Sequence, residues 1–112
     1  MRIGYFGSST GGAAALVAAA ELPQDVAAIV SRGGRPDLAD DALPKVQAPT
    51  LLIVGGNDDI VIELNEMARD QIRCEVKLEI IPDATHLFEE PGALEQVAKL
   101  ASDWFSLHLS RK

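Results

Sequence analysis

The sequence predicts an α/β fold in which a short parallel sheet of about four strands is flanked by helices. Short apolar runs alternate with longer segments of helical period, as expected when each strand is followed by a helix that packs on the sheet. Apolar residues make up 47% of the chain but aromatic residues only 4%. A core of Ala, Val, Leu and Ile suits helices packed closely on a parallel sheet. With 112 residues, one domain is expected over residues 1–112.

The first half of the chain contains two expected strands and one helix. The apolar run Ile3–Phe6 is predicted as the first strand. Residues 11–21, rich in alanine, are predicted as a helix that ends before a Leu-Pro pair, because proline disfavours helical geometry in the residue before it. The run 26–30, Val-Ala-Ala-Ile-Val, is the second expected strand. Residues 31–37 have the composition of a loop, and one short helical turn is expected over 38–43.

The second half contains two more strands, each followed by a helix. The β-branched and leucine run 50–54 predicts a strand buried on both faces. Residues 61–74 have apolar side chains at helical period, 76–81 form the fourth expected strand, and 92–109 form the last helix. His108 is expected at the surface. The apolar face of the last helix is expected to consist of Leu94, Val97, Ala98, Ala101, Trp104 and Phe105.

Charge and cysteine content restrict the function. Seventeen acidic and ten basic residues give a net charge of -7, which argues against binding nucleic acid or a membrane surface, since both need a basic surface. The single cysteine, Cys74, cannot form an internal disulfide and is expected to pack as a small apolar side chain. No signal peptide or membrane-spanning run is evident, so a cytoplasmic location is predicted. No metal-ligand spacing is present, and neither metal nor cofactor is expected.

A glycine- and serine-rich turn joins the first strand to the first helix. Gly7, Ser9 and Gly11 form a G-x-S-x-G pattern, in which a serine stands exposed on a sharp strand-to-helix turn. The flanking glycines are expected because such a turn leaves no room for side chains on either side. Amide groups at the start of the helix would point toward an oxyanion beside the serine. The same pattern also fits an ordinary turn, a helix cap, or a phosphate-binding loop.

Ser9, Asp58 and His86 each follow a predicted strand. A serine hydroxyl needs a base to remove its proton during attack, and a histidine base needs a carboxylate that holds its tautomer. The order serine, acid, histidine belongs to the α/β-hydrolase fold among serine hydrolase scaffolds. The neighbouring Asp59 is the alternative for the acid.

On these residues the chain resembles the α/β-hydrolase superfamily, in particular its dienelactone-hydrolase-like branch, over nearly its whole length. The resemblance implies that Ser9 is the nucleophile, that Asp58 orients the base, and that His86 is general base and then general acid. It implies an oxyanion-hole donor in the backbone amide of Thr10. True dienelactone hydrolases carry a cysteine where this chain has Ser9, so the dienelactone substrate does not follow. The matching pieces are Gly7-Ser-Ser-Thr-Gly11, Pro49-Thr-Leu-Leu-Ile-Val-Gly-Gly-Asn-Asp58 and Asp83-Ala-Thr-His86.

The resemblance begins at the elbow strand, so the expected structure is a truncated α/β-hydrolase fold that lacks the usual N-terminal half. In that fold Ile3–Phe6 would be a bare apolar edge. The loop that usually supplies the second oxyanion-hole amide would also be missing. Self-association would cover such an edge, and a homo-oligomer, most simply a two-fold dimer, is predicted.

Three functions remain open from the sequence. The first is a serine hydrolase that cleaves small carboxylic esters through an acyl-enzyme. In that case Arg32 and Arg35, after the second strand, could hold a substrate carboxylate, although both also fit solvated loop charges. The second is a noncatalytic or weakly active α/β-hydrolase-like module. The third is a phosphate-binding loop, which leaves Asp58 and His86 unexplained.

Overall fold

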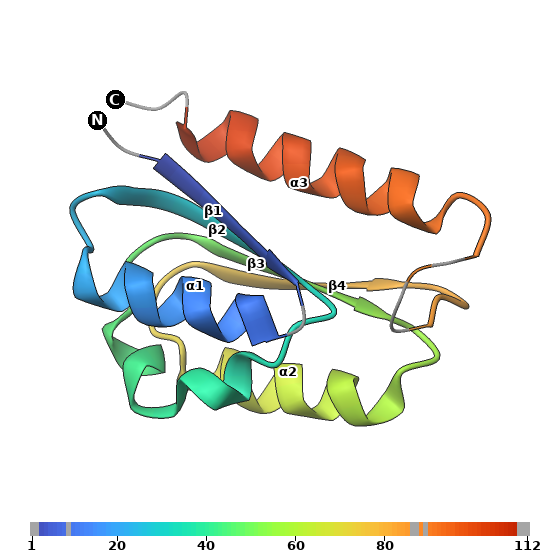
Figure 1. Cartoon of the computed structure of the whole chain (residues 1–112), viewed down its shortest axis with the longest axis horizontal. Coiled ribbons are helices and arrows are strands. Elements are labelled where there is room, and N and C mark those ends of the chain that lie inside the picture. The colour runs from blue at the N-terminus through green and yellow to red at the C-terminus, as the bar shows by residue number, and fades with distance from the viewer. Residues whose placement is uncertain (1–2, 9, 86–87, 89, 110–112) are drawn as a thin grey trace.

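The computed structural model describes residues 3–8, 10–85, 88 and 90–109. Strands and helices alternate along the chain, as the sequence predicts (Figure 1). In chain order the elements are β1 (Ile3–Ser8), α1 (Thr10–Glu21), β2 (Val26–Arg32), the 3-10 segment η1 (Pro36–Lys45), β3 (Thr50–Gly55), α2 (Asp59–Gln71), β4 (Val76–Ile81) and α3 (Ala93–Leu109).

The four strands form one parallel sheet in the order β1-β2-β3-β4. Helix α3 covers one face of this sheet, and α1, η1 and α2 cover the other (Figure 1). This arrangement confirms the predicted fold class. Since all strands run the same way, their carboxyl ends lie at one edge of the sheet, where ligands usually bind in α/β folds.

The core lies on both faces of the two central strands. Every residue of β3 is buried, which confirms the prediction for 50–54, and in β2 only the last residue, Arg32, is partly exposed. Side chains alternate between the faces of a strand. Accordingly, Ile29 packs with α1 and η1, whereas Ala28 and Val30 pack with α3. Alanine in α1 allows that helix to lie close to the sheet.

Several element boundaries differ from the sequence prediction. Strand β1 continues to Ser8 because Gly7 and Ser8 still pair with the end of β2. Helix α2 begins two residues earlier than predicted and ends at Gln71 instead of 74. The predicted short turn over 38–43 is a longer 3-10 segment that is interrupted at Asp40, where φ is 42°.

The buried face of α3 differs in detail from the predicted one. Leu94 is 51% exposed and Ala98 is also exposed, so these two expectations are wrong. His108, expected at the surface, is buried: its ring lies 4.4 Å from that of Trp104 (centroid to centroid), and the Trp104 indole donates to the Pro49 carbonyl oxygen at 3.2 Å. The helix is thus turned so that one continuous stripe faces the sheet. The buried residues of this stripe are Ala93, Val97, Ala101, Trp104 and His108.

Strand β1 lies at one end of the sheet and carries exposed apolar side chains. Ile3 is 42% exposed and Phe6 is 51% exposed. An apolar edge strand offers unpaired backbone groups and apolar surface to another chain or segment. Within the part of the chain that the structure describes, no helix is both long enough and apolar enough to cross a membrane.

Candidate active site at the carboxyl ends of the strands

The turn between β1 and α1 is as short as a nucleophile elbow requires. Strand β1 ends at Ser8 and α1 begins at Thr10. A Cβ atom added to Gly7 would lie 2.5 Å from the carbonyl carbon of Gly11, so only glycine fits there. A Cβ atom added to Gly11 would meet no atom of the described residues within 4 Å, so the expected steric need for glycine is not found on that side. Ser9 itself lies outside the described residues, and its role as nucleophile stays a prediction.

Thr10 is the first residue of α1 and is exposed. Amide N–H groups in the first turn of a helix have no partner within the helix, and they carry the positive end of the helix dipole. The backbone N–H of Thr10 is therefore chemically suited to stabilise an oxyanion beside position 9, which is the role that the sequence predicts for it.

Asp58 lies at the carboxyl end of β3, directly before α2. Its backbone N–H donates to the Gly55 carbonyl oxygen at 3.0 Å, and its own carbonyl oxygen accepts from the Ile62 N–H at 2.9 Å. The turn is thus closed on both sides of the residue. Asp58 is partly buried, whereas Asp59 is exposed as the first residue of the helix. This position favours Asp58 over Asp59 as the acid of a triad.

The loop that carries Asp58 is hydrogen-bonded to the loop that carries His86. The backbone N–H of Asn57 donates to the Ala84 carbonyl oxygen at 2.9 Å, and the Asn57 side-chain amide donates to the Asp83 carbonyl oxygen at 3.1 Å. A Cβ atom added to Gly55 would lie 2.7 Å from the Thr85 carbonyl oxygen. Close contact between the two loops therefore extends to the residue before His86. His86 lies outside the described residues, so its place relative to Asp58 stays a prediction.

Hydrogen bonds among Thr85, Phe88 and Glu90 link the parts of this loop that lie before and after position 86. The Phe88 N–H donates to the Thr85 carbonyl oxygen at 3.1 Å, and the Phe88 side chain is 1% exposed. Glu90 accepts two hydrogen bonds from Thr85, one from the backbone N–H and one from the hydroxyl group, each at 2.9 Å. The hydrogen bond from the Thr85 N–H is the main reason why the pKa of Glu90 is lowered. In the sequence, Glu90 is an acidic residue shortly before the last helix, where a negative charge favours the start of a helix.

Arg32 lies between the elbow strand and the histidine loop. It is the last residue of β2 and pairs with Ser8 of β1 and Ile53 of β3. Its guanidinium carbon lies 5.6 Å from the centroid of the Phe88 ring. Among the described residues, its Nε atom is buried without a hydrogen-bond partner. The position therefore combines a positive charge with a buried donor that no described residue accepts from.

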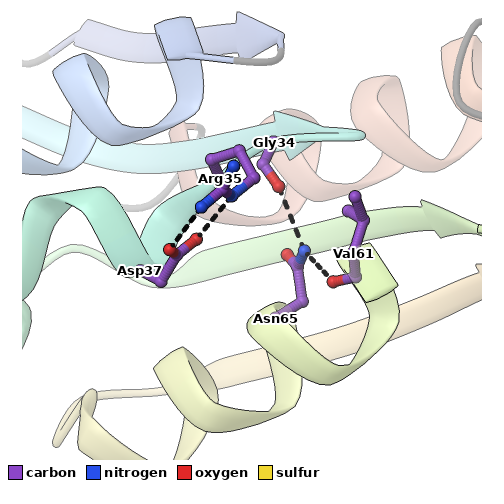
Figure 2. Close-up of polar contacts among 5 residues, drawn as sticks. All are labelled: Gly34, Arg35, Asp37, Val61 and Asn65. Atoms are coloured by element: carbon purple, nitrogen blue, oxygen red, sulfur yellow. Dashed lines mark hydrogen bonds and ion pairs between the residues drawn. The ribbon is translucent and has the colours of Figure 1, made fainter. Parts of the chain in front are cut away.

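Arg35 has a different environment. Its Nε and one terminal nitrogen donate to the two carboxylate oxygens of Asp37 at 3.0 and 2.9 Å (Figure 2), and this contact raises the pKa of Arg35. Figure 2 also shows Asn65 of α2, whose amide donates to the carbonyl oxygens of Gly34 at 3.1 Å and Val61 at 2.7 Å. Asn65 thereby ties α2 to the loop that follows β2. Neither contact is apparent from the sequence pattern.

Across residues 3–8, 10–85, 88 and 90–109, no group of three or more His, Cys, Asp or Glu side chains could hold a metal ion. The parallel sheet, the tight turn after β1 and the joined loops after β3 and β4 are those of an α/β hydrolase. The chain belongs to the dienelactone hydrolase family, which matches residues 1–110.

Solved structures support this assignment. A dienelactone hydrolase from Anabaena variabilis is 65% identical with a TM-score of 0.95, and the match covers 96% of this chain and 50% of that one. The esterase domain of a Rhodothermus marinus protein is 20% identical with a TM-score of 0.85, over 96% of this chain and 62% of that one, and it shows the likeness of fold alone.

Two curated relatives come from Mycobacterium tuberculosis, strains CDC 1551 and H37Rv. Each is 64% identical over 107 residues and bears the provisional name phosphoribosyl transferase. The match covers 96% of this chain but 24% of those proteins. The chain thus spans about a quarter of the length of these relatives and half of the Anabaena chain.

Proposed function

We propose that this chain carries the catalytic triad of a serine hydrolase that cleaves small carboxylic esters. The family supports hydrolase chemistry, and the geometry supports the site. The observation that carries the proposal is the pair of hydrogen bonds from Asn57 to Ala84 and Asp83, because they join the loop of the acid to the loop of the histidine. A triad needs its acid and its base in adjacent loops.

The proposed reaction proceeds through an acyl-enzyme. The Ser9 hydroxyl attacks the ester carbonyl carbon while His86 takes its proton, and Asp58 stabilises the resulting imidazolium. The Thr10 N–H stabilises the tetrahedral oxyanion. As that intermediate collapses, His86 gives the proton to the leaving alcohol. Water then attacks the acyl-enzyme with His86 as base and releases the acid. With Thr10 as one oxyanion donor, a missing second donor would cost on the order of 10²–10³ in turnover.

Hydrolysis of 4-nitrophenyl acetate by the purified protein tests this proposal. Ser9→Ala should remove activity, and Asp58→Asn should lower kcat by up to about 10⁴-fold because a histidine without its carboxylate adopts the wrong tautomer. Asp59→Asn is the matched control and should leave the rate unchanged. Equal rates for wild type and Ser9→Ala, together with no labelling of Ser9 by a fluorophosphonate, would overturn the proposal.

A noncatalytic or weakly active module is the second candidate. The chain matches half of the Anabaena chain and 24% of the mycobacterial proteins, so the activity of those whole proteins is not carried over to it. In such a module the triad residues would be present without a complete pocket. A folded protein that neither hydrolyses esters nor reacts with a fluorophosphonate would support this candidate. We assign the chain no part in phosphoribosyl transfer, because the match covers 24% of the proteins that bear that name.

For the substrate we propose an ester that carries a carboxylate near the reacting carbonyl group, held by Arg32. Arg32 has a buried donor that meets no hydrogen-bond partner among the described residues, whereas Arg35 already donates twice to Asp37. Arg32→Gln should therefore reduce kcat/KM for mono-4-nitrophenyl succinate by about tenfold or more while leaving 4-nitrophenyl acetate nearly unchanged. Arg35→Gln is the control. Equal losses on both esters would argue against a carboxylate site at Arg32.

We also propose that the protein is cytoplasmic and forms a homo-oligomer. A single free cysteine is compatible with a reducing compartment. The exposed apolar side chains of β1 favour self-association at that edge.

A further inference from the structure

We infer that Glu90 is a positioning residue of the hydrolase: by holding Thr85 with both carboxylate oxygens, it fixes the loop that presents the base His86. This inference rests on the proposed function, and it assigns to Glu90 a role that neither the triad nor the family match contains. Glu90 acts through Thr85 and is not itself proposed to touch the substrate.

Both carboxylate oxygens of Glu90 contact Thr85. Oε1 of Glu90 accepts from the backbone N–H of Thr85 and Oε2 accepts from the Thr85 hydroxyl, each at 2.9 Å. Hydrogen bonds to an ionised carboxylate are shorter and stronger than those between neutral groups. Two such bonds to one residue fix both its backbone and its side chain. Thr85 directly precedes His86 in the sequence, so the bonds act on the peptide group next to the base.

The rest of the loop is anchored on either side of this contact. Ala84 is fully buried and accepts a hydrogen bond from Asn57, and Phe88 is buried beneath the guanidinium group of Arg32. Thr85 is exposed and lies between these anchors. Its carbonyl group lies close to Gly55, and its N–H and hydroxyl groups are held by the hydrogen bonds to Glu90.

Glu90 also connects the loop to α3. Its backbone carbonyl oxygen accepts from the N–H of Ala93, the first residue of the helix, at 3.0 Å. The carboxylate and the carbonyl group of one residue therefore join the histidine loop to the start of a helix packed on the sheet. The hydrogen bond from the Thr85 N–H lowers the pKa of Glu90 because it stabilises the ionised carboxylate.

A positioning role predicts a loss in kcat and not in KM. A misplacement of about 1 Å can cost about 10²-fold in rate, so Glu90→Ala should reduce kcat for 4-nitrophenyl acetate by about 10- to 100-fold with KM nearly unchanged. Thr85→Val removes the hydroxyl donor alone and should cause a smaller loss in kcat. Thr85→Ser keeps that donor and should have the kcat of the wild type. Glu95→Ala, an exposed acidic residue in the first turn of α3, is the matched control and should behave as wild type.

Two further measurements separate this inference from its premises. In the Ser9→Ala protein, the amide proton of Thr85 should shift as Glu90 titrates below the ordinary glutamate pKa, and the shift should be absent in Glu90→Gln. An unshifted Thr85 amide would overturn the contact. Fluorophosphonate labelling should be slower in Glu90→Ala than in wild type. Equal labelling of both would overturn the role of Glu90 alone, whereas no labelling of either would overturn the hydrolase proposal and the role of Glu90 with it.

Discussion

The backbone N–H of Asn57 donates to the carbonyl oxygen of Ala84 over 2.9 Å. This bond joins the turn after β3 to the turn after β4, and no regular sheet pairing continues at that point, since the last paired residues of the two strands are Gly55 and Ile81. The parallel register thus ends in a direct contact between the two loops of the proposed site. The loop of the acid is thus joined to the histidine loop by a backbone hydrogen bond and by the short side chain of Asn57.

The elbow should tolerate alanine at Gly11 but not at Gly7. In Gly7→Ala the new Cβ would lie 2.5 Å from the carbonyl carbon of Gly11, which forces the backbone to move and should destabilise the protein by about 1–3 kcal/mol or more. Gly11→Ala, in the first turn of α1, should be neutral or stabilise by up to about 1 kcal/mol because alanine favours the helix. Urea unfolding of both variants measures this difference. Equal free energies of unfolding would contradict the close packing of the turn.

The sequence predicts the fold well because the strands are strongly patterned. The runs 26–30 and 50–54 are apolar on both faces, and this pattern is typical of the central strands that they form. The family assignment also follows from local motifs, because the elbow, acid and histidine segments are each a short continuous stretch of the sequence. The strands also pair in chain order, so each one lies beside the strand that follows it in the sequence.

The sequence predictions of burial are wrong where the orientation of a helix decides which of two similar residues faces the sheet. Leu94 and Ala93 are both apolar and adjacent, and only the direction of α3 across the sheet decides that Ala93 is buried and Leu94 exposed. His108 is buried because it continues the stripe of Trp104. The hydrogen bonds from Thr85 to Glu90, and the ion pair between Arg35 and Asp37, depend on loop conformations that side-chain periodicity does not encode.

Asn65 should be important for stability although it lies on a helix of the periphery. Its side chain is fully buried and donates to the carbonyl oxygens of Gly34 and Val61. Asn65→Ala would leave the buried Gly34 carbonyl oxygen without this donor, and we expect a loss of about 1–3 kcal/mol in the free energy of unfolding. Glu66→Ala, an exposed neighbour on α2, should change it by less than about 0.5 kcal/mol. Denaturant unfolding of the two variants tests this, and similar losses would contradict a specific role for Asn65.

Cys74 should react slowly with thiol reagents in the folded protein. Burial raises its pKa, and its Sγ atom donates to the Ala48 carbonyl oxygen at 3.2 Å. A raised pKa reduces the thiolate fraction, and the thiolate is the reactive form. Alkylation by iodoacetamide at about pH 8.5, the ordinary thiol pKa, should therefore be much slower in buffer than in urea.

The same shift predicts the direction of a pH effect on stability. Because the folded state favours the protonated thiol, its contribution is present below the ordinary thiol pKa and is lost as pH rises through the raised one. Cys74→Ala should remove this alkaline loss. The free energy of unfolding, measured from neutral to alkaline pH for both proteins, checks the effect, and parallel curves would show that Cys74 does not contribute to it.

The exposed edge of the sheet should mediate self-association. Phe6 is 51% exposed on β1, whose outer side is unpaired by any described strand. A stable interface needs more than about 1,000 Å² of buried surface, so a contact at β1 would have to include further exposed apolar side chains, such as Ile3 of β1 and Leu109 at the end of α3, which are 42% and 40% exposed. A charge placed at the centre of that contact would have to be buried without a partner, which is unfavourable. Phe6→Glu should therefore shift the protein from dimer to monomer in size-exclusion chromatography with light scattering.

Leu38→Glu provides the matched control for this test. Leu38 is 54% exposed on η1, which packs on one face of the sheet and is separate from the β1 edge. Both variants replace an exposed apolar side chain by the same charge, so a general effect of charge on solubility would change them alike. If the dimer depends on pairing at β1, only Phe6→Glu should dissociate it. A wild-type protein that is monomeric at micromolar concentration would overturn self-association, and dissociation by both variants would contradict a specific contact at β1.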